Sequence, residues 1–486
     1  NFAYDVMDAW AEEAPEKLAL LWTNDQGEEI RATYAQLKEQ SDQAASYLMS
    51  LGIGKGDPVM LILKRRYEWW IIMLALCKIG AIVIPATHML TKKDIIYRNT
   101  RASVKAIICV DDAYVTGQIQ LAMAESPSVK QYITVTDHGK PIPEGFRDWQ
   151  AEWKQAPKFV RPAFVNNNED TMIMYFTSGT SGEPKMVAHD YLYAMGHLTT
   201  GCFWHNLHEG SLHLTVADTG WGKAVWGKFY GQWFAGATVF VFDHEKFNAD
   251  TLLRQMEKYK VTSFCAPPTI YRFMIREDLS KYDLSSLQYC CTAGEALNPA
   301  VFDKLKELIG LNIMEGFGQT ETTMTLGTFP WMTPKPGSMG IPNAQYNIDL
   351  IRADGTPCED GEKGENGLPE AFAFSASMAE LRKAVYTPHV YVVNLNIDGT
   401  EHKAIMKELQ FHSTTDALLH ADFFEINETK AITVGIPVNL TGHAQGVRDG
   451  GRLSQSIRLI NVTAPYKQIP EKLDIDVTDL QLGKAI

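Results

Sequence analysis

Apolar positions alternate between helical spacing and short continuous runs from the start of the chain to about residue 365. Segments 33–53 and 67–80 carry apolar residues at helical spacing, and the apolar runs 58–63 and 81–86 follow them. The same order returns in the run 237–243, the helix-like segment 248–260, the run 261–268 and the stretch 286–318. This alternation predicts strand–helix–strand units, which build a mostly parallel sheet covered by helices. We therefore expect a large α/β domain over residues 1–365.

The pattern changes beyond a loop rich in glycine and charge, residues 359–380. Helical spacing nearly disappears, and alternating apolar and polar residues predict further strands in 389–406, 431–444 and 459–477. Within the first of these segments, Asp398-Gly399 separates two alternating runs, which is a strong hairpin signal. The predicted organisation is a domain over 1–365, a junction over 366–379 and a mainly β module over 380–486.

Composition and charge exclude several classes of protein. The chain has 486 residues, too many for a single core, and its 45% apolar and 21% charged residues are typical of a soluble globular protein. Its net charge of −13 argues against a protein whose main role is to bind nucleic acid or an anionic membrane. The most apolar stretch, 69–85, is interrupted by Lys78 and Gly80 well short of a membrane span, so no membrane partner is predicted.

The cysteines point to a reducing compartment. All seven are scattered along the chain, and none forms a C-x-x-C spacing, so neither a disulfide framework nor a zinc site is predicted. No signal peptide pattern opens the chain. We expect a cytoplasmic protein.

A loop of small and hydroxyl-bearing residues, "FTSGTSGEPK" at 176–185, follows the apolar run that ends at Phe176. Glycines let backbone N–H groups converge on an anion, and hydroxyls add donors, so such a loop is suited to phosphate. The spacing is not that of a P-loop NTPase, because Lys185 stands three residues after Gly182 and precedes Met186 rather than a hydroxyl. On this loop alone, a flexible surface turn stays an alternative.

Two later loops also follow apolar runs. "TAGEALN" at 292–298 follows "LQYCC" and could lay its backbone against a base or ribose. "EGFGQTET" at 315–322 puts Phe317, Thr320 and Glu321 at the end of another run. Ligands of parallel sheets collect at the carboxyl ends of the strands. We expect all three loops to follow strands of one sheet and to converge on a single ligand.

Together the three loops, in this order, resemble the adenylate-forming superfamily of acyl-CoA synthetases, luciferases and peptide-synthetase adenylation domains over about residues 1–365. The resemblance implies ATP as a substrate and Mg²⁺ as a cofactor. It implies a phosphate loop made of Thr177, Ser178, Gly179, Thr180, Ser181, Gly182 and Lys185. It implies an adenine-binding turn made of Gly294, Glu295 and Ala296, and a signature loop, "GFGQTE" at 316–321. It also implies that ATP is contacted by Glu315, Phe317, Gly318, Gln319 and Thr320.

The resemblance also implies individual roles within these loops. Phe317 would stack on adenine, although ordinary core packing remains an alternative for this ring. The implied catalytic residues are Lys185, Thr320 and Glu321, with Thr320 reaching phosphate and Glu321 holding Mg²⁺. These residue types suit the chemistry, because a carboxylate that attacks the α-phosphate must overcome charge repulsion, which Mg²⁺ and N–H donors reduce.

A further stretch, "ADTGWGKAVWGKFYGQW" at 217–233, resembles the acyl-pocket region of the short- and medium-chain acyl-CoA synthetases. Trp221 or Trp226 could close an acyl channel and so limit chain length, and aromatic core packing on a helix is the alternative for each. The resemblance implies an AMP-forming acid–thiol ligase that activates a monocarboxylic acid with ATP and transfers the acyl group to coenzyme A.

The resemblance stops near residue 366. In that family three features should follow: a ribose-binding Asp in a Y-x-T-G-D-type stretch, a hinge, and a lid domain with a catalytic Lys. None of them is recognisable after residue 366. We therefore expect the family lid to be absent from this chain. Residues 380–486 instead resemble an internal fragment of the bacterial large-subunit ribosomal protein that binds 5S rRNA, a family that includes the general stress protein Ctc. We therefore expect impaired synthetase activity.

The main rival interpretation is a non-catalytic nucleotide- or RNA-binding fusion. From Asn366 onward there are 11 Lys and Arg residues against 14 acidic residues, a net charge of −3. RNA binding depends on neutralising phosphates, so this composition disfavours RNA as a partner without excluding it. No functional reason for joining the two parts is visible, and the simplest explanation is a composite chain, with a natural fusion left open.

Overall fold

The structure is a computed structural model, and it describes most of the chain. The described residues are 1–136, 141–177, 183–352, 356–358, 381, 392–397, 399–411, 418–426, 431–448, 450, 451, 453, 455, 459–470 and 472–481. The chain divides by its contacts into two compact units, Asn1–Asp349 and Leu350–Ile486. The predicted junction, 366–379, lies outside the described residues, and the predicted boundary at 365 stays a prediction.

The first unit contains a seven-stranded sheet in the order β7-β6-β5-β3-β4-β8-β9. Its strands are β3 (Pro58–Ile62), β4 (Ile82–Pro85), β5 (Ala106–Val110), β6 (Gln131–Val135), β7 (Arg147–Asp148), β8 (Thr171–Thr177) and β9 (Lys185–Asp190). Neighbouring strands are parallel except β8 and β9, which pair antiparallel.

A second, nine-stranded sheet in the same unit has the order β16-β15-β14-β13-β12-β10-β11-β1-β2. Its strands are β1 (Leu18–Asn24), β2 (Glu29–Thr33), β10 (Leu212–Thr215), β11 (Thr238–Asp243), β12 (Ser263–Cys265), β13 (Tyr289–Thr292), β14 (Ile313–Gly318), β15 (Met324–Gly327) and β16 (Ile341–Pro342). The central pairings are parallel, and those at both edges are antiparallel. The predicted α/β class with mostly parallel sheets is confirmed.

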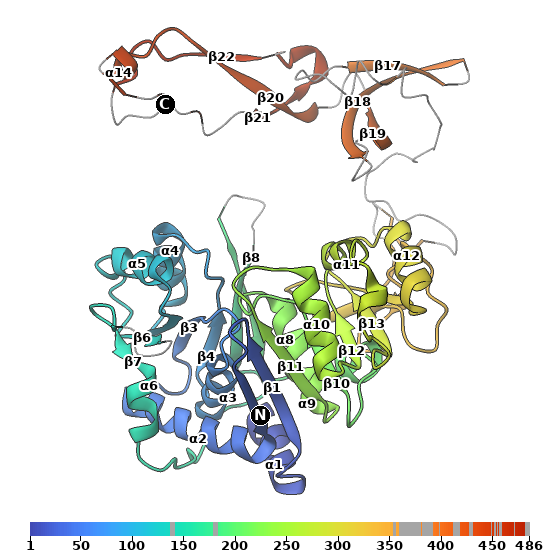
Figure 1. Ribbon diagram of the computed structural model, residues 1–486. Helices are drawn as coiled ribbons and strands as arrows, with labels where there is room; N and C mark the ends of the chain where they lie inside the picture. The colour runs from blue at the N-terminus through green and yellow to red at the C-terminus, as the bar shows by residue number, and fades with distance from the viewer. Residues whose placement is uncertain are drawn as a thin grey trace. The chain divides into compact units, whose positions relative to one another are not determined.

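Helices accompany both sheets of this unit, as Figure 1 shows. They are η1 (Ala3–Asp8), α1 (Ala9–Glu13), α2 (Tyr34–Ser50), α3 (Glu68–Ile79), α4 (Lys92–Ala102), α5 (Ala113–Met123), α6 (Trp149–Glu152), η2 (Trp153–Gln155), α7 (Tyr193–Leu198), η3 (Thr199–Trp204), α8 (Gly222–Lys228), α9 (Tyr230–Phe234), α10 (Ala249–Tyr259), α11 (Pro268–Met274), η4 (Leu279–Lys281) and α12 (Pro299–Ile309). None of the described helices is long and apolar enough to cross a membrane.

The apolar stretch 69–85 shows how local sequence directs this fold. It forms most of α3 and all of β4, and nearly every side chain in it is buried. Gly80 ends the helix with a positive φ of 72°. A Cβ there would lie 2.6 Å from the carbonyl oxygen of Val165, so glycine is required both for the turn and for the close approach.

The second unit is mainly β in its described residues. One antiparallel sheet contains β17 (Val392–Ile397), β18 (Thr400–Phe411) and β19 (Leu418–Glu425). The other contains β20 (Ala431–Thr441), β21 (Leu459–Pro465) and β22 (Leu473–Asp476), accompanied by the short helices α14 (Gln445–Arg448) and η5 (Tyr466–Gln468). Ile397 pairs with Thr400, which confirms the predicted hairpin between the first two strands.

Candidate active site

The predicted phosphate loop joins β8 to β9. Thr177 at the end of β8 pairs in register with Lys185 at the start of β9, so these residues stand at the two ends of the loop. Ser178, Gly179, Thr180, Ser181 and Gly182 lie outside the described residues. The side chain of Lys185 is exposed to solvent.

The predicted signature loop is a tight turn between β14 and the antiparallel β15. The backbone N–H of Gln319 donates to the hydroxyl of Thr322 across 3.0 Å, and the N–H of Thr322 donates back to the carbonyl of Gln319 across 3.1 Å. From β9, Nε2–H of His189 donates to the carbonyl oxygen of Thr320 across 2.7 Å. Burial lowers the pKa of His189, which favours the neutral ring. The turn is therefore fixed both internally and from the neighbouring hairpin.

Residues from all three predicted loops line one pocket of about 430 Å³. Its lining residues are Thr177, Trp221, Gly222, Lys223, Trp226, Ala293, Gly294, Gly318, Gln319, Thr320 and Glu321. The expectation of a single sheet was wrong, because β8 belongs to the seven-stranded sheet whereas β13 and β14 belong to the nine-stranded sheet. Apolar periodicity identifies strands but carries no information on which strands pair.

The two predicted pocket tryptophans differ in burial. Trp226 on α8 is only 6% exposed, whereas Trp221, just before that helix, is 54% exposed. The core-packing alternative therefore fails for Trp221. Both residues line the pocket, Trp226 as a buried ring and Trp221 as an exposed one.

Two glycines of β14 allow indole rings from other elements to pack directly on the backbone of the strand. A Cβ on Gly318 would overlap the ring of Trp226, and one on Gly316 would lie 2.6 Å from Cε2 of Trp204. Trp204 is fully buried at the end of η3. Each ring therefore packs on the backbone of the strand where a side chain would otherwise stand.

Some predicted site residues do not line the pocket. The carboxylate of Glu295 accepts from Arg272 of α11 across 2.9 Å, and Ala296 is exposed. Phe317 is 39% exposed, so the core alternative for this ring is wrong. Its stacking on adenine stays a prediction.

Glu315 lies inside the protein. One of its carboxylate oxygens accepts from the backbone N–H of Leu297 across 3.2 Å, and the other is buried without a hydrogen-bond partner among the described residues. Burial raises the pKa of this carboxyl group. The contact braces the segment that follows the predicted adenine-binding turn, and direct ATP binding by Glu315 stays a prediction.

Sequence reasoning missed Lys223. This residue lies on α8, lines the pocket, and donates from Nζ to the carbonyl oxygen of Ala293 across 2.6 Å. Burial lowers its pKa. The signal available in the sequence was a lysine within an otherwise apolar and small-residue stretch between two tryptophans, where a solvated charge is out of place.

The donor set at the turn suits Mg²⁺. Glu321 supplies a carboxylate to the pocket, which Thr320 and Thr177 also line. Within the described part of the chain, no group of three or more His, Cys, Asp or Glu side chains could hold a metal by itself. Magnesium is commonly held by one or two carboxylates together with substrate phosphates, so a single carboxylate fits a nucleotide-bound ion.

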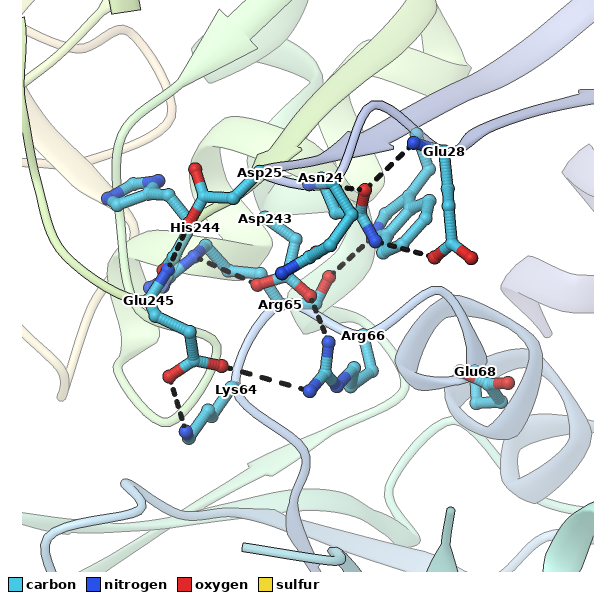
Figure 2. Close-up of polar contacts among 12 residues, drawn as sticks. Asn24, Asp25, Glu28, Lys64, Arg65, Arg66, Glu68, Asp243, His244 and Glu245 are labelled. Atoms are coloured by element: carbon cyan, nitrogen blue, oxygen red, sulfur yellow. Dashed lines mark hydrogen bonds and ion pairs between the residues drawn. The ribbon is translucent and has the colours of Figure 1, made fainter. Parts of the chain in front are cut away.

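A second, larger hollow of about 1420 Å³ lies where β1, β3, β5 and β11 end. Figure 2 shows its ion pairs, in which Lys64 contacts Glu245 across 2.9 Å and Arg66 contacts Asp243 across 3.2 Å. Its acidic lining residues are Asp25, Glu28, Glu29, Glu68, Asp111, Asp112, Asp148, Asp243 and Glu245. This excess of negative charge would repel a polyphosphate, so the smaller pocket is the better nucleotide site.

Comparison with protein families agrees with the two-part organisation. Residues 7–366 match the family described as AMP-binding enzyme. Residues 363–423 match the Ribosomal L25p family, and residues 431–486 match the family described as Ribosomal protein TL5, C-terminal domain. Both predicted resemblances, to adenylate-forming enzymes and to the 5S rRNA-binding ribosomal protein family, are confirmed.

Curated relatives of the first part are acyl-CoA synthetases. The chain is 35% identical over 372 residues to Acyl-coenzyme A synthetase ACSM3, mitochondrial, of Rattus norvegicus, covering 75% of this chain and 63% of that protein. It is 36% identical over 371 residues to Acyl-coenzyme A synthetase ACSM5, mitochondrial, of Homo sapiens, with the same coverage. The match thus spans less than two thirds of these relatives. Their names place them in mitochondria, and the cytoplasmic location of this chain stays a prediction.

Solved structures share the fold. An anthranilate CoA ligase, AuaEII, in complex with anthranoyl-AMP matches with a TM-score of 0.69 and 22% identity, covering 84% of each chain. Acetoacetyl-CoA Synthetase from Streptomyces lividans matches with a TM-score of 0.68 and 21% identity, covering 74% of this chain and 58% of that one. From the family match over residues 7–366, the chain belongs to the AMP-binding enzymes.

Proposed function

We propose that the first part of this chain binds ATP and a short- or medium-chain monocarboxylic acid, and that in the complete enzyme it forms an acyl-adenylate and then acyl-CoA. The observation that carries the proposal is one pocket lined by Thr177, Gly294 and Thr320, from three loops far apart in sequence, together with buried Trp226. Such a pocket combines hydroxyls and backbone groups that suit phosphate with an apolar indole that suits an acyl chain.

Some of these residues would bind the charged phosphates and Mg²⁺, and others would position the adenine. The hydroxyls of Thr177 and Thr320, the loop N–H groups and Lys185 would hold the phosphates, and Glu321 would hold Mg²⁺. Bound magnesium lowers the repulsion between the substrate carboxylate and the α-phosphate. The carboxylate oxygen then attacks the α-phosphorus, and pyrophosphate leaves. Phe317 would stack on the adenine, and the backbone of Gly294, Glu295 and Ala296 would face its edge.

The acyl chain of the substrate would extend toward Trp226. This ring is buried and lines the pocket, so it would limit how many methylene groups fit, whereas Trp221 lines the pocket as an exposed ring. Each excluded methylene costs about 0.8 kcal/mol of burial. A short or medium chain therefore fits better than a long one.

We further propose a synthetase domain over 1–365, a junction over 366–379 and a ribosomal-type β module over 380–486. The ribosomal family matches begin at residue 363, where a hinge and lid would be expected. Without the lid lysine the α-phosphate lacks one cation, and without a hinge no second conformation admits coenzyme A. Adenylate formation is then slow, and thioester formation is lost.

A second candidate function is nucleotide or RNA binding without catalysis. The matches of residues 363–423 and 431–486 to ribosomal families favour it. The net charge of −3 beyond Asn366 weakens it, since RNA binding requires phosphate neutralisation. Salt-dependent retention of 5S rRNA by the full chain would support this candidate.

Acid-dependent exchange of pyrophosphate into ATP tests the main proposal. The full chain, with its mass verified, is incubated with ATP, Mg²⁺, labelled pyrophosphate and a panel of acids of two to ten carbons. Exchange that requires the acid supports adenylate formation, and addition of coenzyme A should yield no acyl-CoA. Absence of both exchange and ATP binding would refute the nucleotide site, and robust acyl-CoA formation would refute the proposed impairment.

A further inference from the structure

Tyr193, the first residue of α7, contacts the buried tryptophan of the pocket, Trp226, and does not itself line the pocket. The indole Nε1–H of Trp226 donates to the hydroxyl oxygen of Tyr193 across 3.2 Å. Both side chains are buried. An indole has a single side-chain donor, so this hydrogen bond fixes which way the ring faces.

The same indole also rests on the turn that carries the nucleotide loop. Its ring fills the space that a side chain on Gly318 would occupy, and Gly318 directly precedes Gln319 and Thr320. A rotation of the indole toward the strand is therefore blocked by backbone, and a rotation away from it breaks the bond to Tyr193. The ring is held between a hydrogen bond and a steric stop.

The ring of Tyr193 is itself held independently of its hydroxyl. His189 stacks on it with centroids 3.9 Å apart and planes 17° apart, and His197 meets it edge-on at 4.7 Å. His189 also donates to the carbonyl oxygen of Thr320. Removing only the hydroxyl should therefore leave the tyrosine ring and the nucleotide turn in place, while freeing the indole.

We propose that Tyr193 is a positioning residue that sets acyl-chain selectivity by holding the indole of Trp226 against Gly318. The inference rests on the proposed function, because it requires an acyl chain that ends on Trp226. Without the hydroxyl the indole can turn away from the strand, which deepens the pocket for longer chains and loosens its contact with shorter ones. The residue acts through Trp226 and need not touch the substrate.

Stable mimics of the acyl-adenylate test this without requiring turnover. The full chain is titrated by calorimetry with acyl-sulfamoyl-adenosines whose acyl chains run from two to ten carbons. Tyr193→Phe should shift the ratio of dissociation constants for long and short chains by roughly 3- to 10-fold toward the longer ones, the scale of one net hydrogen bond. Trp226→Phe, which removes the donor instead, should shift the same ratio and keeps the test available if Tyr193→Phe does not fold.

Tyr191→Phe is a matched control. Its hydroxyl is buried without a hydrogen-bond partner among the described residues, and it lies two positions from Tyr193. An unchanged ratio in this control and a shifted ratio in Tyr193→Phe support the inference. A uniform weakening of all chain lengths in Tyr193→Phe, or a ratio equal to that of the control, overturns it and leaves the proposed function standing. If the wild-type chain binds none of the mimics, the proposed function fails, and this inference fails with it.

Discussion

Lys223 donates from Nζ to the carbonyl oxygen of Ala293 across 2.6 Å, which connects α8 to the end of β13. The two residues are 70 positions apart and both line the pocket. The bond brings a nitrogen that can carry positive charge to the place where the predicted adenine-binding turn begins. It also keeps the first turn of α8, and therefore the segment that bears Trp226, next to the nucleotide loops.

Replacing this lysine should weaken binding of an acyl-adenylate mimic. We expect Lys223→Met to raise the dissociation constant of hexanoyl-sulfamoyl-adenosine roughly tenfold, because loss of the hydrogen bond to Ala293 releases the end of β13 where the predicted adenine-binding turn begins. Isothermal titration calorimetry measures this. Lys304→Met is the control, since Lys304 is a surface residue of α12 that pairs with Glu307. Equal dissociation constants of the mimic in the two variants would show that Lys223 does not contribute to ligand binding.

Glu321 should determine the magnesium dependence. Glu321→Gln is expected to reduce transition-state stabilisation by about 2–4 kcal/mol, the scale of losing one well-placed charged group. Acid-dependent pyrophosphate exchange over a range of Mg²⁺ concentrations measures the change. Glu307→Gln is a suitable control, because that carboxylate pairs with Lys304 on the surface of α12 and does not line the pocket. An unaltered magnesium profile in Glu321→Gln would contradict the assignment.

Gly318 should tolerate no side chain. In Gly318→Ala the new methyl group overlaps the indole of Trp226, so we expect a loss of about 1–3 kcal/mol in the free energy of unfolding. Gly117→Ala, on α5 with open space around the Cβ position, should instead gain roughly 0.5–1 kcal/mol. Urea unfolding compares the two. Stability equal to that of the wild type in Gly318→Ala would show that the indole is free to move.

Lys228 should make stability depend on pH. Burial lowers its pKa from the ordinary value of 10.5 to about 7. Between these values the unfolded chain holds a proton that the folded protein has released, so the free energy of unfolding rises with pH. Lys228→Met has no titrating group at this position, so its stability lacks this pH dependence. Above pH 7 the free energy of unfolding of the wild type should therefore rise relative to that of the variant, on the order of 1 kcal/mol per pH unit.

Urea unfolding at several pH values within this window measures the difference. Parallel curves for the wild type and Lys228→Met would mean that the lysine stays protonated in the fold. In that case the hydrogen bond from its Nζ to the carbonyl oxygen of Ala217, 2.7 Å long, would suffice to hold the charge.

Local patterns in the sequence predicted much of the fold. The helical spacing over 67–80 and the apolar run over 81–86 predict a helix and a strand, and these segments contain α3 and β4. The Asp-Gly pair at 398 and 399 predicted the hairpin between β17 and β18. These features depend on residues close together in the chain, where spacing and turn chemistry determine the outcome.

The features that sequence reasoning missed depend on distant contacts. Tyr193 and Trp226 are 33 positions apart, and nothing in either segment indicates that one accepts a hydrogen bond from the other. The burial of Lys223 likewise follows from the packing of α8 beside β13. The sequence also did not predict that β8 and β14 belong to different sheets, because tertiary packing determines which strands pair.

Gly318 allows the size of the pocket to change without a change in the strand that carries the nucleotide loop. A strand normally presents its own side chains to a cavity, so a change in cavity size alters the strand itself. Here β14 presents bare backbone at Gly318, and the indole of Trp226 on α8 takes the place of a strand side chain in the pocket wall. A substitution of Trp226 can therefore enlarge or reduce the cavity while the turn at Gln319–Glu321 keeps its sequence and its hydrogen bonds. We expect relatives that accept acids of different size to differ at this position and to retain the same nucleotide loop.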